Sequence, residues 1–311
     1  MSWDERIGRR IKLRDLHILL AVVHAGSMAK ASSQLAVSQP AVSKAIAEME
    51  RALGVRLLNR TPMGVEPTDY GRALIKRSTI VFDELRQGIK EIEFIADPTV
   101  GEIRIGSTEP LGEGLVTAAI DRLSRKYPRI RFEVVQGDPV TLIRELEDRN
   151  VELVLARLFE PSISEHMKAE IFYSDAFVVI AGVENPWIRR RKVELADLID
   201  EPWTLMPRDT FTGAAIFDAF RAEGLEPPRA TVATSSLSLR NSLLATGRFL
   251  STRPAATLKF SSGYIAIKAL PVELPTTRRP VGLITLKSRV LSPVAQLFVD
   301  CARDIVKSRP T

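Results

Sequence analysis

The sequence has a single cysteine and no apolar run of membrane-spanning length. Cys301 cannot form a disulfide within one chain, and it lies in an apolar helical pattern, where a buried and inert thiol is expected. The apolar run Ile18–Val23 is too short for a signal peptide and lacks a small-residue cleavage pattern. We therefore expect a cytoplasmic protein with no membrane partner.

Histidine is also scarce, and the usual catalytic motifs are absent. The three histidines are His17, His24 and His166; the first two lie in one helical pattern without metal-binding spacing, so no metal site is expected. There is no P-loop, and the glycines after residue 105 do not form a dinucleotide fingerprint. Ser107 and Ser236 lack the setting of a hydrolase nucleophile. We expect no enzyme and no cofactor.

Positive charge is concentrated at the start of the chain. Residues 1–79 contain 13 Lys or Arg and 7 Asp or Glu, a net charge of +6, whereas the remaining 232 residues carry 31 of each sign. The whole chain is 45% hydrophobic with a mean hydropathy near zero, which is typical of globular domains. This distribution favours a protein that binds a polyanion with its first domain and something else with the rest.

Residues 27–54 predict two short helices separated by a break at residues 36–38. Ala31 and Leu35 mark the buried stripe of the first helix. The second stripe follows helical spacing through Val42, Ile46, Met49 and Leu53. Ser38 is a suitable N-cap and Pro40 fits the first turn, so the second helix should begin at about Gln39.

The opposite face of that second helix is small or polar. It comprises Gln39, Pro40, Ser43, Lys44 and Ala47. Such a face can enter the DNA major groove, where Gln and Lys bond base edges. A plain pair of helices with a solvated face would give the same local pattern, so the flanking segments matter.

Both flanks complete a small DNA-binding domain. Upstream, a helical stripe ends at Gly26 and comprises Leu13, Leu16, Leu20 and Val23. Downstream, Val55–Leu58 predicts a strand, Thr61–Gly64 a turn, and Val65–Glu66 a returning strand. This hairpin would be a wing whose Arg56 and Arg60 contact phosphate or the minor groove.

Taken together, SQPAVSK, LGVRLLNR and PTDYG, in this order and spacing, resemble the winged helix-turn-helix of LysR-type transcriptional regulators. The resemblance implies that Gln39, Pro40, Ser43 and Lys44 read base edges. It also implies that Ser38, Arg60 and Thr68 contact the DNA backbone. The family often has Arg where this chain has Lys44, and Lys lacks the planar fork needed for bidentate contacts.

Residues 68–96 predict a long helix, of about 42 Å at 1.5 Å per residue. Its apolar residues form a heptad seam of Leu74, Ser78, Val81, Leu85, Gly88, Ile92 and Ile95, widened by Ile75, Phe82 and Ile89. The helix could lie on its own domain. The family resemblance implies instead that it pairs with a second subunit as a linker and dimerisation helix, and we expect a homo-oligomer, with two dimers associating as a tetramer.

After a hinge at residues 97–101, strands and helices alternate. This pattern predicts an α/β fold overall: a mainly α-helical winged domain (1–67), the linker helix (68–96) and a two-lobed α/β effector-binding domain (102–311). The resemblance to type 2 periplasmic binding proteins that the family implies places lobe I at 102–173 and 281–311, and lobe II at 177–275. The chain would cross between the lobes near residues 173–177 and 272–281.

An effector is expected at the carboxyl ends of the strands, between the lobes. The residues placed there are Ser107, Thr108, Gly137, Arg157, Arg208, Thr210, Phe211, Ser235 and Ser236. Hydroxyl-rich helix starts and two arginines favour a carboxylate or a sugar acid, although Glu109 and Glu113 oppose this.

The sequence therefore predicts a transcriptional regulator that binds double-stranded promoter DNA and is controlled by a small-molecule effector. A solute-binding protein would account for the C-terminal lobes alone, and it would leave the basic winged head and the heptad helix without a role. An enzyme on the same lobes is a third hypothesis, which the lack of a catalytic group disfavours.

Overall fold

The computed structural model describes residues 11–61, 64–158, 164–260 and 266–308. The chain divides into two compact units, residues 1–89 and 90–311. Within the described residues, no helix combines the length and apolarity required to cross a membrane.

The first unit is a three-helix domain with a two-stranded hairpin. Its elements are α2 (Leu13–Ala25), α3 (Met28–Gln34), α4 (Gln39–Leu53), β1 (Leu58–Thr61) and β2 (Gly64–Pro67), followed by the 28-residue α5 (Asp69–Ala96). Ala31, Val42, Ile46 and Met49 are buried in one core, as their spacing predicts. Gly26 ends α2 with a φ of 65°, a left-handed conformation in which glycine has no steric penalty.

Two local predictions in this unit differ from the structure. In the predicted stripe of α2, Leu16 and Val23 pack against the core, but the fully buried residues are Ile18, Leu19 and Val22, and Leu13 is 49% exposed. The first wing strand begins at Leu58 instead of Val55, because the Glu50 carboxylate accepts hydrogen bonds from the amides of Leu57 and Leu58 and holds this segment against α4.

In the second unit, lobe I is built on a five-stranded sheet of order β4-β3-β5-β12-β6. The strands are β3 (Val100–Ser107), β4 (Arg129–Gln136), β5 (Leu153–Arg157), β6 (Met167–Asp175) and β12 (Arg279–Leu286). Its helices are α6 (Glu109–Leu111), a π-helical turn η1 (Gly112–Val116), α7 (Thr117–Lys126), α8 (Pro139–Glu147) and α12 (Pro293–Ser308).

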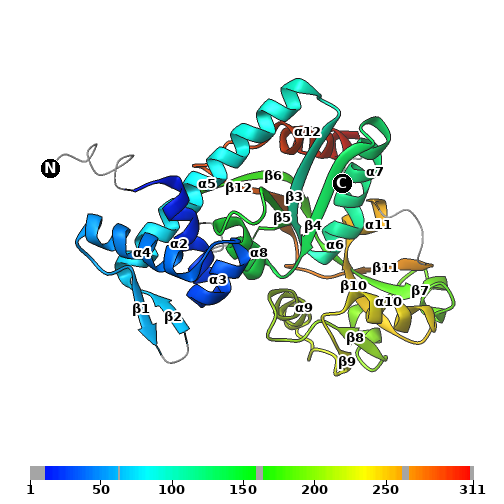
Figure 1. Cartoon of the computed structure of the whole chain (residues 1–311). Coiled ribbons are helices and arrows are strands. Elements are labelled where there is room, and N and C mark those ends of the chain that lie inside the picture. Colours follow the sequence, from blue (N-terminus) through cyan, green and yellow to red (C-terminus); the bar gives the residue numbers. More distant parts are fainter. Residues whose placement is uncertain (1–10, 62–63, 159–163, 261–265, 309–311) are drawn as a thin grey trace. The chain divides into compact units, whose positions relative to one another are not determined.

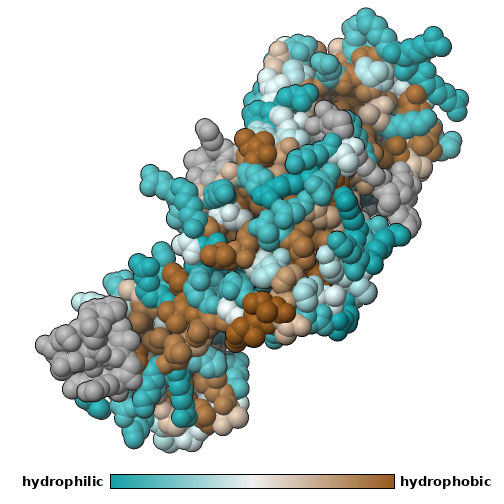
Figure 2. All heavy atoms as spheres, turned by 90° about the horizontal axis from the view of Figure 1, so that it is seen from above, coloured by the Kyte–Doolittle hydropathy of each residue, from teal (hydrophilic) through white to brown (hydrophobic). Residues whose placement is uncertain are grey.

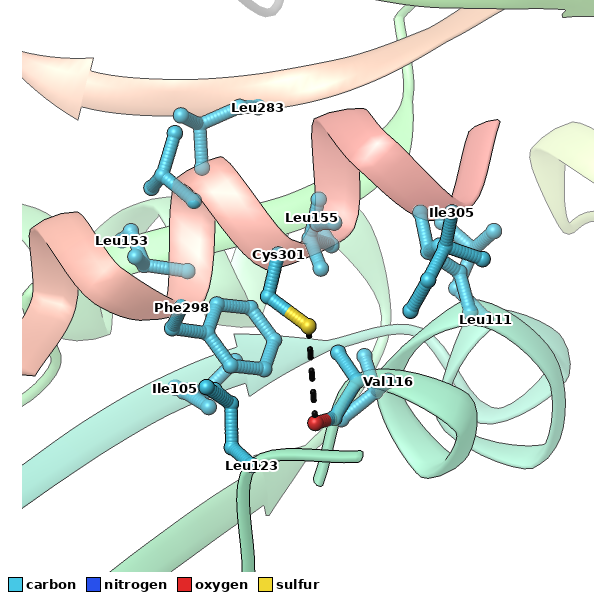
Figure 3. Packing of buried hydrophobic residues seen from close by; sticks show 14 of the residues in the cluster. Ile105, Leu111, Val116, Leu123, Leu153, Leu155, Leu283, Phe298, Cys301 and Ile305 are labelled. Carbon is cyan, nitrogen blue, oxygen red and sulfur yellow. Dashed lines mark hydrogen bonds between the residues drawn. The ribbon is translucent and has the colours of Figure 1, made fainter. Parts of the chain in front are cut away.

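Both faces of this sheet are covered by helices, which explains the unbroken apolar run of β5. Leu153 and Leu155 face the core formed with α7 and α12, whereas Val154 and Ala156 face the core formed with α8. Alternate residues of a strand point to opposite faces, so both sets are buried. Figure 3 shows Cys301 of α12 in the first core, where the thiol donates to the Ala119 carbonyl at 3.9 Å.

The position of Cys301 confirms the expectation of a buried thiol. Burial raises its pKa, so the thiol stays protonated and unreactive.

Lobe II contains a second five-stranded sheet, of order β11-β7-β10-β8-β9. Its strands are β7 (Phe177–Gly182), β8 (Trp203–Leu205), β9 (Ala230–Ala233), β10 (Leu250–Pro254) and β11 (Ile267–Glu273). Its helices are α9 (Phe211–Ala222) and α10 (Leu237–Ala245), with 3-10 turns η2 (Pro186–Arg189) and η3 (Leu195–Leu198). The chain passes between the lobes from β6 to β7 and again from β11 to β12.

Candidate functional site

The exposed face of α4 is the candidate DNA-reading surface. Val42, Ile46 and Met49 anchor the opposite face in the core, so α4 presents a fixed surface to solvent. The predicted reading residues Gln39, Pro40 and Lys44 are exposed, and Ser43 is half-buried. Lys44 Nζ lies 3.9 Å from Glu48 Oε1 in an exposed pair, which competes little with DNA.

The turn into α4 is fixed by local hydrogen bonds. The Val37 amide donates to the Ser32 carbonyl at 3.0 Å, and Ala36 has a positive φ of 52°. Ser38 accepts a hydrogen bond from the Ala41 amide at 3.4 Å, which makes it the predicted N-cap.

Thr68 connects the wing to the linker helix. Its hydroxyl donates to the Arg56 carbonyl at 2.7 Å and accepts from the Gly71 amide at 3.0 Å. The Thr68 hydroxyl is thus engaged within the protein and caps α5, so we do not retain it as a DNA contact. Arg56 is exposed beside it. Arg60 belongs to β1, and its side chain lies outside the described part of the structure.

The apolar residues of α5 divide into two groups. Leu74 and Ile75 pack on the DNA-binding core, and the Phe82 ring lies 5.7 Å from that of His17 in α2. Five apolar residues from 81 onward are exposed, and the exposed fraction of their side chains rises toward the helix end: Val81 39%, Leu85 46%, Ile89 57%, Ile92 68% and Ile95 80%. Figure 2 shows one face of the molecule, on which hydrophobic (brown) and hydrophilic (teal) residues are interspersed. These five residues form an apolar seam that the described residues of this chain leave open to solvent.

The carboxyl ends of β3 and β4 meet at one edge of lobe I, as predicted. The Gly137 amide donates to the Ser107 carbonyl at 3.4 Å, and the Thr108 amide donates to the Leu155 carbonyl at 3.3 Å. Ser107 is fully buried and its hydroxyl donates to the Thr108 carbonyl, so it supports this edge and cannot face a ligand. Thr108 and Gly137 are half-buried.

The corresponding edge of lobe II is formed by the starts of α9 and α10. Thr210 caps α9 by accepting from the Gly213 amide at 3.0 Å, and its hydroxyl donates to the Pro207 carbonyl. Ser236 caps α10 by accepting from the Leu239 amide at 3.2 Å. Arg208 and Ser235 are exposed, and Phe211 is 49% exposed. The Arg208 guanidinium lies 5.6 Å from the centre of the Phe217 ring.

Arg157 lies at the crossing between the lobes, where it is only 8% exposed. Its guanidinium donates to the carbonyls of Asp175 (2.9 Å) and Thr277 (2.7 Å), one in each crossing segment. It also lies 3.6 Å from the Asp175 carboxylate and stacks over the Phe177 ring. Arg157 therefore holds the crossings together, and we do not retain it as an effector contact.

The ion pair at the crossing is strongly desolvated. Burial lowers the pKa of Arg157 and raises the pKa of Asp175, while the attraction between the two groups opposes both changes. The Asp175 carboxylate also accepts from the Ala256 amide at the start of α11 (Ala255–Phe260). A cavity of about 400 Å³ lies beside this pair, lined by the crossing segments and α11, and none of the nine predicted effector residues lines it.

Four charged residues that the sequence did not place in the site lie where the two lobes meet: Glu109, Glu113, Arg240 and Arg253. Glu109 Oε2 accepts from the Leu237 amide at 3.2 Å, and Glu113 Oε2 lies 2.7 Å from the Arg253 guanidinium. Arg253 is 2% exposed and Arg240 6%. Burial is the main cause that lowers the pKa of both arginines, and both glutamates oppose it.

This inter-lobe charge cluster brings two predicted loops together, because Glu109 follows Thr108 and Leu237 follows Ser236. Sequence reasoning noted both glutamates only as an opposing charge. Arg253 lies in β10, whose sequence LSTRP is mostly polar and gives no sign that all five of its residues are buried. Among the described residues, no group of three or more His, Cys, Asp or Glu side chains is placed to hold a metal ion.

Two family models match this chain. Residues 13–72 match the model described as bacterial regulatory helix-turn-helix protein, lysR family, and residues 96–307 match the LysR substrate binding domain. The HTH-type transcriptional regulator GbpR of Azospirillum brasilense is 27% identical over 94% of this chain and 86% of its own length. YeiE of Escherichia coli, an uncharacterized HTH-type transcriptional regulator, is 31% identical over 65% of this chain and 67% of its own length.

Solved structures share the fold. The LysR family transcriptional regulator CbnR superposes with a TM-score of 0.62 and 20% identity, covering 94% of this chain and 98% of CbnR. A full-length OxyR variant from Pseudomonas aeruginosa gives a TM-score of 0.67 and 19% identity, with 94% of each chain covered. With both family models matched across its two units, the chain belongs to the LysR family: it is a DNA-binding transcriptional regulator with an effector-binding domain, and not an enzyme.

Proposed function

We propose that the exposed face of α4 reads a promoter site in the major groove. Gln39, Pro40, Ser43 and Lys44 contact base edges, and Ser38, Arg56 and Arg60 contact the DNA backbone. The observation that carries this proposal is the small, polar, exposed face of a helix whose other face is buried. The net charge of +6 within residues 1–79 supports it, as does a solved complex of full-length CbnR with its target DNA.

The apolar seam of α5 pairs with the same seam of a second copy. Pairing removes five exposed apolar side chains from water and places two reading heads on one DNA, which suits a partly palindromic site. Such a dimer acts in the cytoplasm, where promoter DNA is accessible.

The effector binds between the facing edges of the two lobes. Its contacts come from Thr108 and Gly137 on lobe I, and from Arg208, Thr210, Phe211, Ser235 and Ser236 on lobe II. Hydroxyl groups and helix starts at these edges suit a small carboxylate or sugar acid. Ligand binding changes the orientation of one lobe relative to the other. This in turn changes the geometry of the oligomer on DNA.

DNA binding is tested by a mobility-shift titration of the full chain against DNA upstream of its own and neighbouring genes. We expect a specific shift whose affinity falls linearly on a log–log plot with salt concentration, because phosphate contacts release counter-ions. Absence of a shift with every such DNA at low salt would contradict the proposed promoter site.

A further inference from the structure

Two carboxylates of lobe I contact lobe II, one at the start of a helix and the other at a buried arginine. Glu109 Oε2 accepts from the Leu237 amide in the first turn of the nine-residue helix α10. Glu113 pairs with Arg253, whose guanidinium also donates to Asn241 Oδ1 at 3.1 Å. These contacts lie between the loops where the effector is proposed to bind.

The lobe II side of this contact is built as an anion site. The start of α10 offers free amides and the positive end of its dipole. Two guanidinium groups stand beside it, on side chains that are more than nine-tenths buried. The Nε atoms of Arg240 and Arg253 have no hydrogen-bond partner within the described residues. Two buried guanidinium groups need anions nearby, because a buried charge without a counter-ion is strongly unfavourable.

We propose that Glu109 and Glu113 are internal counter-ions that occupy an anion site of lobe II in the ligand-free protein, and that the effector is an anion whose acidic group takes their place. This inference rests on the proposed function, in that it assigns a ligand class to the site between the lobes. Both glutamates are partly exposed and can turn toward solvent when they are displaced.

Only an anionic ligand can exchange with these carboxylates. A neutral ligand that displaced Glu113 would leave Arg253 buried without a counter-ion, which is strongly unfavourable. A neutral ligand that left both glutamates in place would not alter the contact between the lobes. It would bind the arrangements with and without this contact equally well, and so could not shift the protein from one to the other. Replacement by a ligand anion keeps the arginines neutralised and frees lobe I from lobe II.

The test uses the full chain with Glu109→Gln and Glu113→Gln combined, and sulfate as a probe for the acidic group. The double variant removes both negative charges from the site but keeps the side-chain size, so its melting temperature should fall by several degrees. Millimolar sulfate should restore it along a saturable curve, because a ligand that binds the folded state stabilises it. Wild type should respond only at a much higher sulfate concentration than the variant, because sulfate must there displace both carboxylates; sodium chloride of equal ionic strength is the reference.

Glu194→Gln is the matched control, because it removes an exposed ion pair with Lys192 elsewhere in lobe II. If the double variant does not fold, Glu109→Gln alone is used. It removes the negative charge at the start of α10 and leaves the Glu113–Arg253 pair intact. Equal sulfate responses in wild type, control and variant, or no response in the variant, would overturn the proposal. Promoter binding by wild type is measured on the same preparation, so failure of the proposed DNA-binding function shows separately.

Discussion

Lys44 is the residue on α4 whose contact decides sequence preference. Its side chain is 77% exposed, and that of the nearby Glu48 is 48% exposed. We predict that Lys44→Ala weakens binding to the preferred site by about 1 to 3 kcal/mol and relaxes preference at one base position. The measurement is a mobility-shift series on DNA sites with single base-pair changes.

Arg56→Ala is the matched comparison, because Arg56 is exposed on the wing side and is assigned to phosphate. It should weaken binding to all DNA sequences alike and lower the salt slope by about 1. If both variants lost affinity equally on every sequence, Lys44 would be only a phosphate contact.

At the residue scale, the sequence predicted where residues lie at the lobe edges better than it predicted what their side chains contact. Ser107, Thr108 and Ser236 were placed at strand ends and helix starts, where the structure has them. The role of Arg157 could not be predicted, because its carbonyl partner in Thr277 is 120 residues away. The same applies to Glu113 and Arg253, which lie 140 residues apart in sequence.

At the element scale, the exposed seam of α5 gives a prediction about assembly. Leu85 and Ile92 are one heptad apart and are 46% and 68% exposed. Replacing both with Glu places charges where two apolar helices should pack. Burial of each such side chain contributes roughly 1.5–3 kcal/mol, so the dimer should dissociate at micromolar concentration, as measured by sedimentation.

Val290→Glu is the control for this experiment, since Val290 is 71% exposed and lies outside α5. It should leave the oligomeric state unchanged. An oligomer that persists in the α5 variant would place the interface elsewhere.

Elements with a clear local pattern were predictable, and elements that depend on distant partners were not. The turn into α4 and the long helix α5 follow from capping and heptad spacing. Strand β6 (MKAEIFYSD) loses its alternation of apolar and charged residues at Ile171–Tyr173, where its register with β12 shifts; among the described strands it pairs with β12 alone, at the edge of its sheet. Helix α11 is six residues long, and its first turn is held by Asp175, 81 residues away. The π-helical turn η1 interrupts what the sequence indicates as one helix.

At the scale of the whole effector-binding unit, Arg157 joins both crossings between the lobes. Its contacts with the carbonyls of Asp175 and Thr277 bridge segments that are far apart in the chain. The charge pair is buried, so removal of one partner costs more than the pair itself contributes, because the remaining charge is left uncompensated. Replacing Arg157 therefore measures how much its contacts stabilise the two crossing segments.

We predict that Arg157→Met lowers the free energy of unfolding by about 3–5 kcal/mol at neutral pH. The loss should shrink as the pH falls. Burial already raises the pKa of Asp175, and the variant lacks the arginine that opposes this rise. A carboxyl whose pKa is raised in the folded state stabilises the fold when protonated, and this contribution is lost as pH rises through the folded pKa.

The measurement is urea unfolding of the full chain between neutral pH and about pH 4, near the ordinary pKa of Asp. Two of the three tryptophans report on lobe II by their fluorescence, since Trp203 is buried there and Trp187 is partly buried. Arg157→Met combined with Asp175→Asn is the control. Because this variant has no buried charge at the crossing, it should recover part of the stability at neutral pH. Its difference in unfolding free energy from wild type should not shrink as the pH falls. A stability loss for Arg157→Met that stayed constant across this pH range would mean that Arg157 acts through its hydrogen bonds to the crossing carbonyls and not through the charge of Asp175.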